Sequence, residues 1–222
     1  MANIPVLRDR KPVIDGRVTE QESQGAAVVS MNILGGLDKP RNPTKVMMFF
    51  TQNALYVGFI CTDSTPDTTI ARTQKENGPV FSDDSVQLFV TPEKDGTRTN
   101  YFHFAVNAAG VRYSMDMSKD APVPNWTSAV QHTQTGWEAE MLIPFSSVKG
   151  NLDGDFWRGN VARFRAGREG LLSETSSWIN TGTTLHNFRR LGYLAKSDPL
   201  APKVVRSKPQ ETTSSADGGT TK

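Results

Sequence analysis

The sequence predicts an all-β protein: an antiparallel β-sandwich of the jelly-roll or immunoglobulin-like kind, with long loops. Two observations lead to this prediction. No long segment repeats apolar residues at the 3.6-residue period of a surface helix, and short runs rich in Val, Phe, Tyr and Thr are separated by turn residues instead. About eight or more short strands at hairpin spacing favour packed antiparallel sheets, because a parallel α/β sheet would need crossover helices between its strands.

The expected strands begin with a hairpin. Residues 45–50 and 55–61 are joined by the turn at 51–54, a loop of ordinary hairpin length. Residues 68–77 could form a minor helix. The remaining expected strands are 86–91, 100–107, 111–117, 128–132, 137–143, 160–165 and 188–194, with a turn-rich segment at 93–99.

Length and composition fit one folded domain with an appendage. The chain has 222 residues, of which 36% are hydrophobic, which is enough for one well-buried core. We expect a sandwich domain over residues 1–197 and a disordered tail or linker over residues 198–222, where Pro, Ser, Thr and Gly outnumber residues that could be buried. Another domain could be attached through this tail.

Charge and apolar content exclude several classes of partner. The net charge of +2 gives no field that would predict a nucleic acid as partner. No apolar run approaches the roughly 20 residues that cross a bilayer, and residues 1–5 lack the basic-then-apolar pattern of a signal peptide. The single cysteine, Cys61, excludes an internal disulfide and a Cys-rich metal site. We therefore expect no nucleic acid, no membrane insertion and no signal peptide in this sequence.

Alternation along the strands at 86–91 and 100–107 separates a core face from a mixed face, because successive side chains point to opposite sides of a sheet. The core face carries Val, Leu and Phe. A face that mixes polar and aromatic residues is a solvated surface, the lining of a cleft or a surface covered by loops, and the residues alone leave these three readings open. On this mixed face lie Ser85, Gln87, Phe89, Tyr101, His103, Ala105 and Asn107.

Two adjacent acids, Asp83 and Asp84, precede the strand at 86–91. A glycosidase needs two carboxylates that face each other about 5 to 10 Å apart, whereas adjacent residues entering a strand point to opposite faces. These acids therefore do not predict catalysis. Two alternatives remain: a calcium site shared with Asp63 or Asp67, since hard cations collect carboxylate oxygens from loops, or acids that accept backbone N–H groups and fix the strand entry.

Other catalytic signatures are missing from the sequence. The three histidines are not at metal-ligand spacings, and no Ser or Cys nucleophile is placed beside a base. No glycine-rich phosphate loop is present. Arg163, on the strand at 160–165, is expected to form an ion pair with Glu140 or to contact a ligand. The sequence therefore predicts that the protein is not an enzyme.

Several sequence islands, in this order and spacing, resemble the family 9 carbohydrate-binding modules, β-sandwich domains common in secreted bacterial proteins that degrade polysaccharides. The resemblance covers roughly residues 12–195. The islands include Val13-Ile-Asp-Gly16, Ser82-Asp-Asp-Ser-Val-Gln-Leu-Phe89, Tyr101-Phe-His-Phe-Ala-Val-Asn107, Gly136-Trp-Glu-Ala-Glu-Met-Leu-Ile-Pro-Phe145 and Ser177-Trp178.

The resemblance implies that a sugar is gripped between two aromatic side chains, while nearby polar groups bind its hydroxyls. Carried over to this sequence, the aromatic residues are Phe81 and Trp178, and the polar residues are Gln87 and Asn107. Trp126, in a proline-rich loop, could line the edge of the site. A pyranose ring offers a C–H face to an aromatic ring and a hydroxyl rim to planar amides, so these residue types suit such a ligand.

The resemblance also implies calcium ions that brace the loops, with Asp63, Asp83 and Asp84 as candidate ligands, and an extracellular or periplasmic location. This sequence departs from the family pattern at three positions, and at one of them Phe81 replaces a more usual Trp. Ala105 stands where binding members carry an Arg, and Ser23 stands where a Trp is expected.

Three functions are consistent with these observations. The first is a non-catalytic module that binds an oligo- or polysaccharide and targets a secreted protein to it. The second is a structural or assembly sandwich that has lost the sugar site, which the departures at Ser23, Phe81 and Ala105 favour. The third and least supported is a haem-binding relative, in which Met115, Met117 or His103 would supply the axial ligand.

Overall fold

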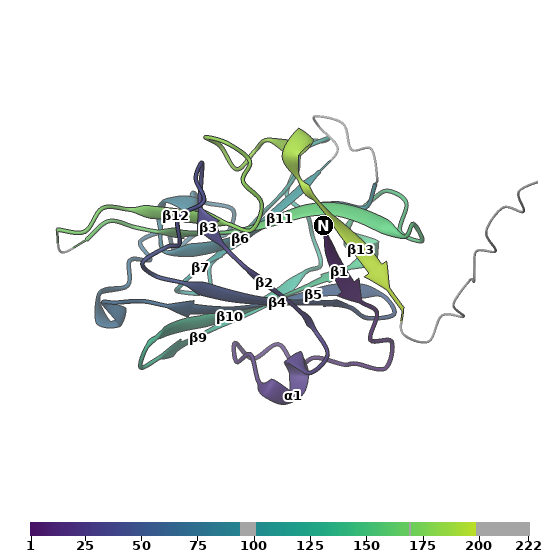
Figure 1. The fold of residues 1–222 in the computed structure, drawn as a ribbon, viewed down its shortest axis with the longest axis horizontal. Coiled ribbons are helices and arrows are strands. Elements are labelled where there is room, and N and C mark those ends of the chain that lie inside the picture. Colours follow the sequence, from purple (N-terminus) through teal and green to yellow (C-terminus); the bar gives the residue numbers. More distant parts are fainter. Residues whose placement is uncertain (94–100, 169, 199–222) are drawn as a thin grey trace, which may run out of the picture.

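The computed structural model describes residues 1–93, 101–168 and 170–198. Two β-sheets pack face to face, with few and short helices (Figure 1), which confirms the predicted all-β sandwich. Residues 94–99 of the predicted turn segment and nearly all of the predicted tail lie outside the described residues. Of that tail only Asp198 is described, and it forms an ion pair with Arg8 at 2.6 Å.

The first sheet, sheet A, has the strand order β1-β13-β11-β6-β7-β8, and β12 and β3 extend it beside β11. All pairings are antiparallel except the parallel pair of β1 and β13. The strands are β1 (Ala2–Pro5), β3 (Asn32–Ile33), β6 (Ser85–Thr91), β7 (Phe102–Asn107), β8 (Arg112–Asp116), β11 (Phe156–Arg165), β12 (Glu174–Ser177) and β13 (Gly192–Ser197).

The second sheet, sheet B, has the order β2-β4-β5-β10-β9, and all of its pairings are antiparallel. Its strands are β2 (Ala27–Ser30), β4 (Thr44–Phe50), β5 (Ala54–Thr62), β9 (Thr127–Thr133) and β10 (Gly136–Pro144). The helical elements are the single turn α1 (Glu20–Ser23) and the 3-10 turns η1 (Pro66–Thr68), η2 (Val80–Ser82), η3 (Phe145–Ser147) and η4 (Phe188–Arg190). None of the described helices is long and apolar enough to span a membrane.

The main core lies between the two sheets and is built from the apolar face of each strand. Trp137 and Trp157 are fully buried there, as expected for large side chains on inward-facing strand positions. The alternation predicted for β6 and β7 is confirmed, because Val86, Leu88, Val90, Phe102, Phe104 and Val106 all belong to this core.

The outer face of sheet B is covered by the N-terminal segment that contains α1, which lies below that sheet in Figure 1. Glu140, on β10, is fully buried and fastens this segment. Its carboxylate accepts hydrogen bonds from the backbone N–H groups of Asp15 (3.0 Å) and Gly16 (2.8 Å) and from the Tyr56 hydroxyl (2.7 Å). Gly16 has φ +93° and a Cβ there would lie 2.6 Å from the Val130 carbonyl carbon, so only glycine fits.

Three predicted details of secondary structure differ from the structure. The expected strand at 188–194 begins with the turn η4, and its strand, β13, starts only at Gly192. The minor helix at 68–77 does not form, since η1 ends at Thr68 and an irregular segment follows. The short strands β1, β2, β3 and β12 were not expected, because strands of two to four residues carry too little alternation to be recognised.

Candidate functional site

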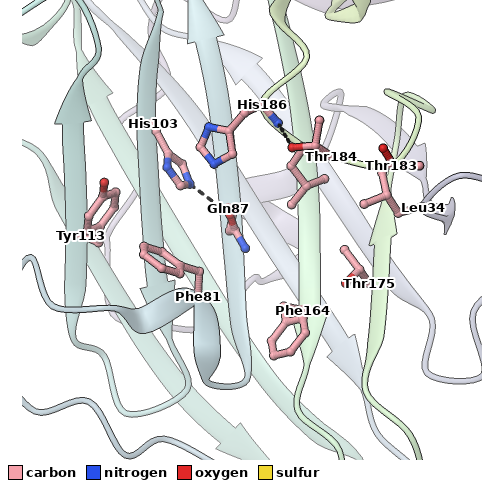
Figure 2. Close-up of a pocket in the computed structure, with 11 residues that line it drawn as sticks. Leu34, Phe81, Gln87, His103, Tyr113, Phe164, Thr175, Thr183, Thr184 and His186 are labelled. Atoms are coloured by element: carbon pink, nitrogen blue, oxygen red, sulfur yellow. Dashed lines mark hydrogen bonds between the residues drawn. The ribbon is translucent and has the colours of Figure 1, made fainter. Parts of the chain in front are cut away.

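A cavity of about 330 Å³ opens on the outer face of sheet A (Figure 2). Strands β6, β7, β8 and β11 provide its floor, and loops provide its rim. Among the described residues, no Asp, Glu, Lys or Arg lines it, so its chemistry is aromatic, hydroxyl, amide and imidazole. The lining residues are Leu34, Phe81, Gln87, His103, Tyr113, Phe164, Thr175, Thr183, Thr184, Leu185 and His186.

Gln87 and His103 form the floor of the cavity from neighbouring strands. Their side chains are 3% and 1% exposed, and His103 Nε2 and Gln87 Oε1 share a hydrogen bond of 3.0 Å. Because Gln87 Oε1 accepts, the assigned tautomer of His103 carries its proton on Nε2. The Gln87 amide nitrogen makes no hydrogen bond to any described residue, and in Figure 2 it points into the space between Phe81 and Phe164. The cavity therefore has one free amide donor at its floor.

Burial keeps His103 uncharged. Its ring stacks on Phe89 with centroids 4.2 Å apart and an interplanar angle of 14°. Burial, with a smaller contribution from His186, lowers the pKa of His103 from 6.5 to about 3. Nδ1 of this ring is buried without a hydrogen-bond partner in the described structure. At neutral pH the floor of the cavity thus carries no charge.

Phe81 and Phe164 flank the floor on opposite sides of Gln87 (Figure 2). Phe81, in η2, is 41% exposed, and its ring meets the edge of Tyr113 at 5.4 Å and 88°. Phe164 is half-buried on β11, where it pairs with Ser85 of β6 and Thr175 of β12. Two aromatic rings with a free amide between them match the chemistry that a pyranose ring requires.

Ala105 sits in the strand ladder between Gln87 and Tyr113, and it is fully buried. The family carries an arginine at this position, according to the resemblance. In this chain the Ala105 side chain is too short to reach into the cavity and carries no charge. The departure therefore changes the chemistry of the cavity but does not fill it.

The rim on the other side is a loop that hydrogen bonds to itself. The Thr181 hydroxyl donates to the Thr184 carbonyl (2.7 Å), and the Asn187 amide donates to the Thr181 carbonyl (3.1 Å). His186 Nδ1 lies 2.9 Å from the Tyr101 hydroxyl, which ties the loop to β7. Thr183 and Thr184 are exposed on this rim, so their hydroxyl groups are available to a ligand.

Trp178 does not line this cavity, although the resemblance placed it opposite Phe81. It follows β12 directly, and its backbone N–H donates to the Val161 carbonyl at 3.0 Å. Ser177 pairs with Ala162 on the outer face, so the next side chain turns inward, where Trp178 packs against the main core. Phe164 takes the place opposite Phe81 instead.

Trp126 lies in the main core and is 4% exposed. Its ring meets Phe104 edge-on at 5.3 Å, and the Arg112 guanidinium lies 5.6 Å from its centroid. Its residual surface belongs to a separate pocket with Glu76 and Arg112. The structure therefore does not bring Trp126 to the edge of the cavity.

Asn107 acts behind the cavity rather than in it. Its side chain is fully buried, and both its amide nitrogen and its amide oxygen form hydrogen bonds. Nδ2 donates to Asp83 (2.9 Å) and to the Thr73 carbonyl (3.1 Å). Oδ1 accepts from the backbone N–H of Val111 (2.9 Å). Asp83 also accepts from the N–H groups of Arg72 (3.0 Å) and Thr73 (2.9 Å). Together Asp83 and Asn107 hold the segment before β6, which carries Phe81, so Asn107 is a positioning residue.

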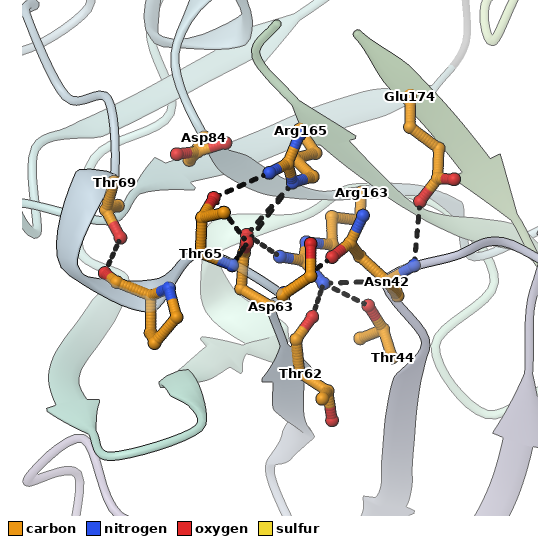
Figure 3. Close-up of polar contacts among 12 residues, drawn as sticks. Asn42, Thr44, Thr62, Asp63, Thr65, Thr69, Asp84, Arg163, Arg165 and Glu174 are labelled. Carbon is orange, nitrogen blue, oxygen red and sulfur yellow. Dashed lines mark hydrogen bonds and ion pairs between the residues drawn. The ribbon is translucent and has the colours of Figure 1, made fainter. Parts of the chain in front are cut away.

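Asp63 lies in a cluster of three arginines, of which Arg163 and Arg165 are labelled in Figure 3. Its buried carboxylate pairs with Arg163 (3.0 Å), Arg165 (3.2 Å) and Arg168 (2.7 Å). Burial acts to raise the pKa of Asp63, but the Thr65 N–H and the three guanidinium charges outweigh it, so the pKa lies below its usual value. Arg163 therefore pairs with Asp63, not with Glu140 as expected.

Asp84 completes this cluster. Its carboxylate accepts from Arg168 (2.9 Å), from Ile70 N (2.7 Å) and from Ala166 N (2.9 Å). Both adjacent acids thus accept backbone N–H groups and fix the entry to β6, which is one of the two alternatives drawn from the sequence.

Calcium does not fit Asp63, Asp83 and Asp84 as they are arranged. Their oxygen atoms are taken up by guanidinium and backbone donors, and three cationic side chains already surround Asp63. Calcium needs six to eight oxygen ligands. Within residues 1–93, 101–168 and 170–198, no group of three or more His, Cys, Asp or Glu side chains is placed to hold a metal ion.

Haem does not fit the predicted axial ligands either. His103 Nε2 is engaged by Gln87, and its other nitrogen is buried inside the protein. Met115 and Met117 are half-buried, and Met117 packs on the small cluster of Phe89, Tyr101 and Leu191 beside the cavity.

The sequence missed most of the cavity wall. Tyr113 and Phe164 alternate onto the mixed face of their strands, and extending the alternation from β6 and β7 to β8 and β11 could have found them. Leu34 and the rim residues 183–186 carry no comparable signal, because loop packing alone brings them to the cavity.

Comparisons with known proteins agree with the geometry. The family model described as carbohydrate family 9 binding domain-like matches residues 14–193. A family 9 module from Caldicellulosiruptor kristjanssonii has the same fold, both in complex with cellotriose (TM-score 0.67, 20% identity, 93% of this chain and 100% of that chain) and with glucose (TM-score 0.64, 20% identity, 92% and 100%).

A putative carbohydrate-binding protein from Bacteroides uniformis is similar as well (TM-score 0.66, 17% identity, 89% of this chain and 100% of that chain). At these identities the solved structures show the shared fold alone. No curated protein matches the chain.

Proposed function

The chain belongs to the carbohydrate family 9 binding domain-like family, and we propose that it binds a neutral sugar in the cavity on the outer face of sheet A. The observation that carries this proposal is the pair of rings Phe81 and Phe164 on either side of the free Gln87 amide. The sugar ring stacks on Phe81, while the Gln87 amide and the threonine hydroxyls of the rim bind its hydroxyl groups.

Phe81 suits this role because it is held in place yet exposed. Asp83 and Asn107 fix the segment that carries it, and Tyr113 packs against its ring with centroids 5.4 Å apart. Phe81 is nevertheless 41% exposed, so part of the ring is open to a ligand. A rigid aromatic platform loses little side-chain entropy on binding, which favours affinity.

The proposed activity is binding without catalysis. Hydrolysis of a glycosidic bond uses two carboxylates that face the substrate. The cavity is lined by no Asp or Glu, and its histidine floor is uncharged at neutral pH. The cavity therefore supplies orientation and stacking, and it does not supply a general acid.

The proposed role of such binding is to bring an attached or associated activity to polysaccharide outside the cytoplasm. This extends the family membership, whose relatives from Caldicellulosiruptor kristjanssonii bind cellotriose and glucose. The uncharged cavity supports neutral glycans as the ligand class.

Calorimetric titration with glucose, cellotriose and xylo-oligosaccharides tests the proposal. The wild type is expected to bind at least one of them, and Phe81→Ala is expected to weaken binding by about tenfold, because a stacked ring contributes on the order of 1 kcal/mol. Val28→Ala is the control, since Val28 is an exposed apolar side chain on β2 of sheet B, away from the cavity (58%). Absence of binding by the wild type, or equal losses in both variants, would contradict the cavity as the site.

A further inference from the structure

Three aromatic side chains among the described residues are exposed, and all lie on the outer face of sheet A: Phe81 (41%), Phe156 (37%) and Tyr193 (37%). Phe81 belongs to the cavity. Phe156 and Phe164 lie on the same strand, β11, and their side chains point to the same face of the sheet. The two residues are about 26 Å apart along the strand, at roughly 3.3 Å per residue. Tyr193 pairs with Arg158 across β11 and β13 and shares that face.

Phe156 and Tyr193 form a rigid surface pair. Their rings are 6.4 Å apart at 87°, an edge-to-face arrangement. Arg158 fixes one side of this pair, because its guanidinium lies 5.2 Å from the Tyr193 centroid. Arg158 Nη2 in turn donates to the carbonyls of Arg189 (2.9 Å) and Leu191 (2.8 Å). The aromatic surface is therefore preorganised.

The charge of Arg158 is not neutralised by any described acid. Its hydrogen bonds go to backbone carbonyls, and its Nη1 makes none to a described residue. Arg189 is exposed beside Phe188, 5.8 Å from that ring, and it forms no ion pair or side-chain hydrogen bond within the described part of the chain. Both arginines thus carry a charge without an ion-pair partner among the described residues, Arg158 against the Tyr193 ring and Arg189 beside Phe188.

The nearest acids along the chain do not pair with these arginines. Asp153 and Asp155 line a pocket that also contains Arg8 and Lys196. In the described part of the chain, neither acid forms an ion pair with Arg158 or Arg189. Exposed aromatic rings with unpaired arginines are enriched at recognition surfaces, because both contribute strongly once they are desolvated.

We propose that Phe156, Tyr193, Arg158 and Arg189 form a second carbohydrate site, the arginine platform, which binds acidic glycans built from hexuronates. A hexuronate has an apolar C–H face, which stacks on the Phe156 ring that Tyr193 supports, and a carboxylate, which pairs with a guanidinium fork. The cavity at the other end of the face has no cationic lining residue. The two sites therefore select different sugars, and the platform does not depend on binding in the cavity.

Titration of the full chain with an oligogalacturonate hexamer and with cellohexaose at low ionic strength tests the platform. The wild type is expected to bind the hexuronate at the platform more weakly as salt rises, since screening reduces ion pairing. Arg189→Ala is expected to weaken hexuronate binding by about tenfold, the scale of one charge-assisted contact. Tyr193→Ala is expected to weaken it to a similar extent.

Two controls separate this outcome from loss of folding or of net charge. Arg17→Ala removes one exposed guanidinium that contacts Gln131 on sheet B, and it is expected to leave hexuronate binding unchanged. Phe81→Ala is expected to affect neutral sugars alone. The proposal is overturned if the wild type does not bind the hexamer, if Arg17→Ala matches Arg189→Ala, or if a single-stranded oligonucleotide binds as tightly at the same residues.

Discussion

The outer faces of the two sheets begin from the same strand pattern and end as different surfaces. On sheet B, polar residues of β10 face a segment of the chain itself: Glu140 binds Asp15 and Gly16, and Glu138 accepts from Val18 N at 2.7 Å. On sheet A, Gln87 and Tyr113 face an open cavity. The same alternation therefore produces a structural anchor where the chain covers it and an open cavity where the chain does not.

The buried titratable groups of the two faces also differ in their hydrogen-bond partners and in the direction of their pKa shifts. Glu140 has three hydrogen-bond donors, whereas His103 keeps one ring nitrogen without a partner in the described structure. Burial raises the pKa of Glu140 despite those donors, and burial lowers the pKa of His103 to about 3. A buried group whose polar atoms all have hydrogen-bond partners indicates a role in stability. A buried group beside a cavity that keeps a polar atom without a partner indicates a role in binding.

The largest expected effect is on sheet B. Glu140→Ala leaves two backbone N–H groups and the Tyr56 hydroxyl without acceptors and is expected to lower the free energy of unfolding by about 3 kcal/mol. Glu140→Gln retains an acceptor for the N–H groups and a donor for Tyr56, so its loss should be under about 1 kcal/mol. Denaturant unfolding measures both. A large loss of sugar affinity in Glu140→Gln would break the distinction between the faces.

The next effect concerns pH. His103 has a folded pKa of about 3 against 6.5 unfolded, so its neutral form stabilises the fold above 6.5 and this stability is lost as pH falls towards 3. Between pH 6.5 and 5 the wild type should lose about 1.5 kcal/mol relative to His103→Gln, whose side chain does not titrate. Thermal or denaturant unfolding across this range checks the difference. Parallel pH profiles for the two proteins would show that His103 is not buried as described.

The smallest expected effect on stability belongs to the cavity floor. Gln87→Ala removes the free amide and should weaken sugar binding by about tenfold, or about 1.4 kcal/mol, by leaving ligand hydroxyls unpaired. Its unfolding free energy should change less than that of Glu140→Ala, because within the described part of the chain the Gln87 side chain makes only one hydrogen bond, to His103. Calorimetry and denaturant unfolding on one sample give both numbers. Unchanged affinity would remove Gln87 from the proposed site.

The sequence predicted the fold and the two faces of β6 and β7 because the alternation there is long and regular. It also brought Phe81 and Gln87 to one place, through their position beside the paired acids and on the mixed face. These predictions depend on local pattern, which the period of a strand fixes.

Trp178 could not be placed in this way. An irregular segment at 166–173 precedes β12, so alternation along the sequence does not show which β12 side chains face the core. The pairing of β12 with β11 decides this, and it turns Trp178 inward. The roles of Asp63 and Asn107 were hidden for a related reason. Their partners lie far away in sequence, such as Arg163 and Arg165 for Asp63, and composition does not reveal which acid meets which base.

The central claim is that a neutral sugar binds on the outer face of sheet A and not on that of sheet B. Titration of isotope-labelled protein with cellotriose, followed by amide chemical shifts, tests it most directly. The account predicts shifts at Gln87, His103 and Thr184, with Gly16 and Glu140 unchanged. Shifts centred on Gly16 and Glu140, or none on either face at saturating sugar, would contradict it.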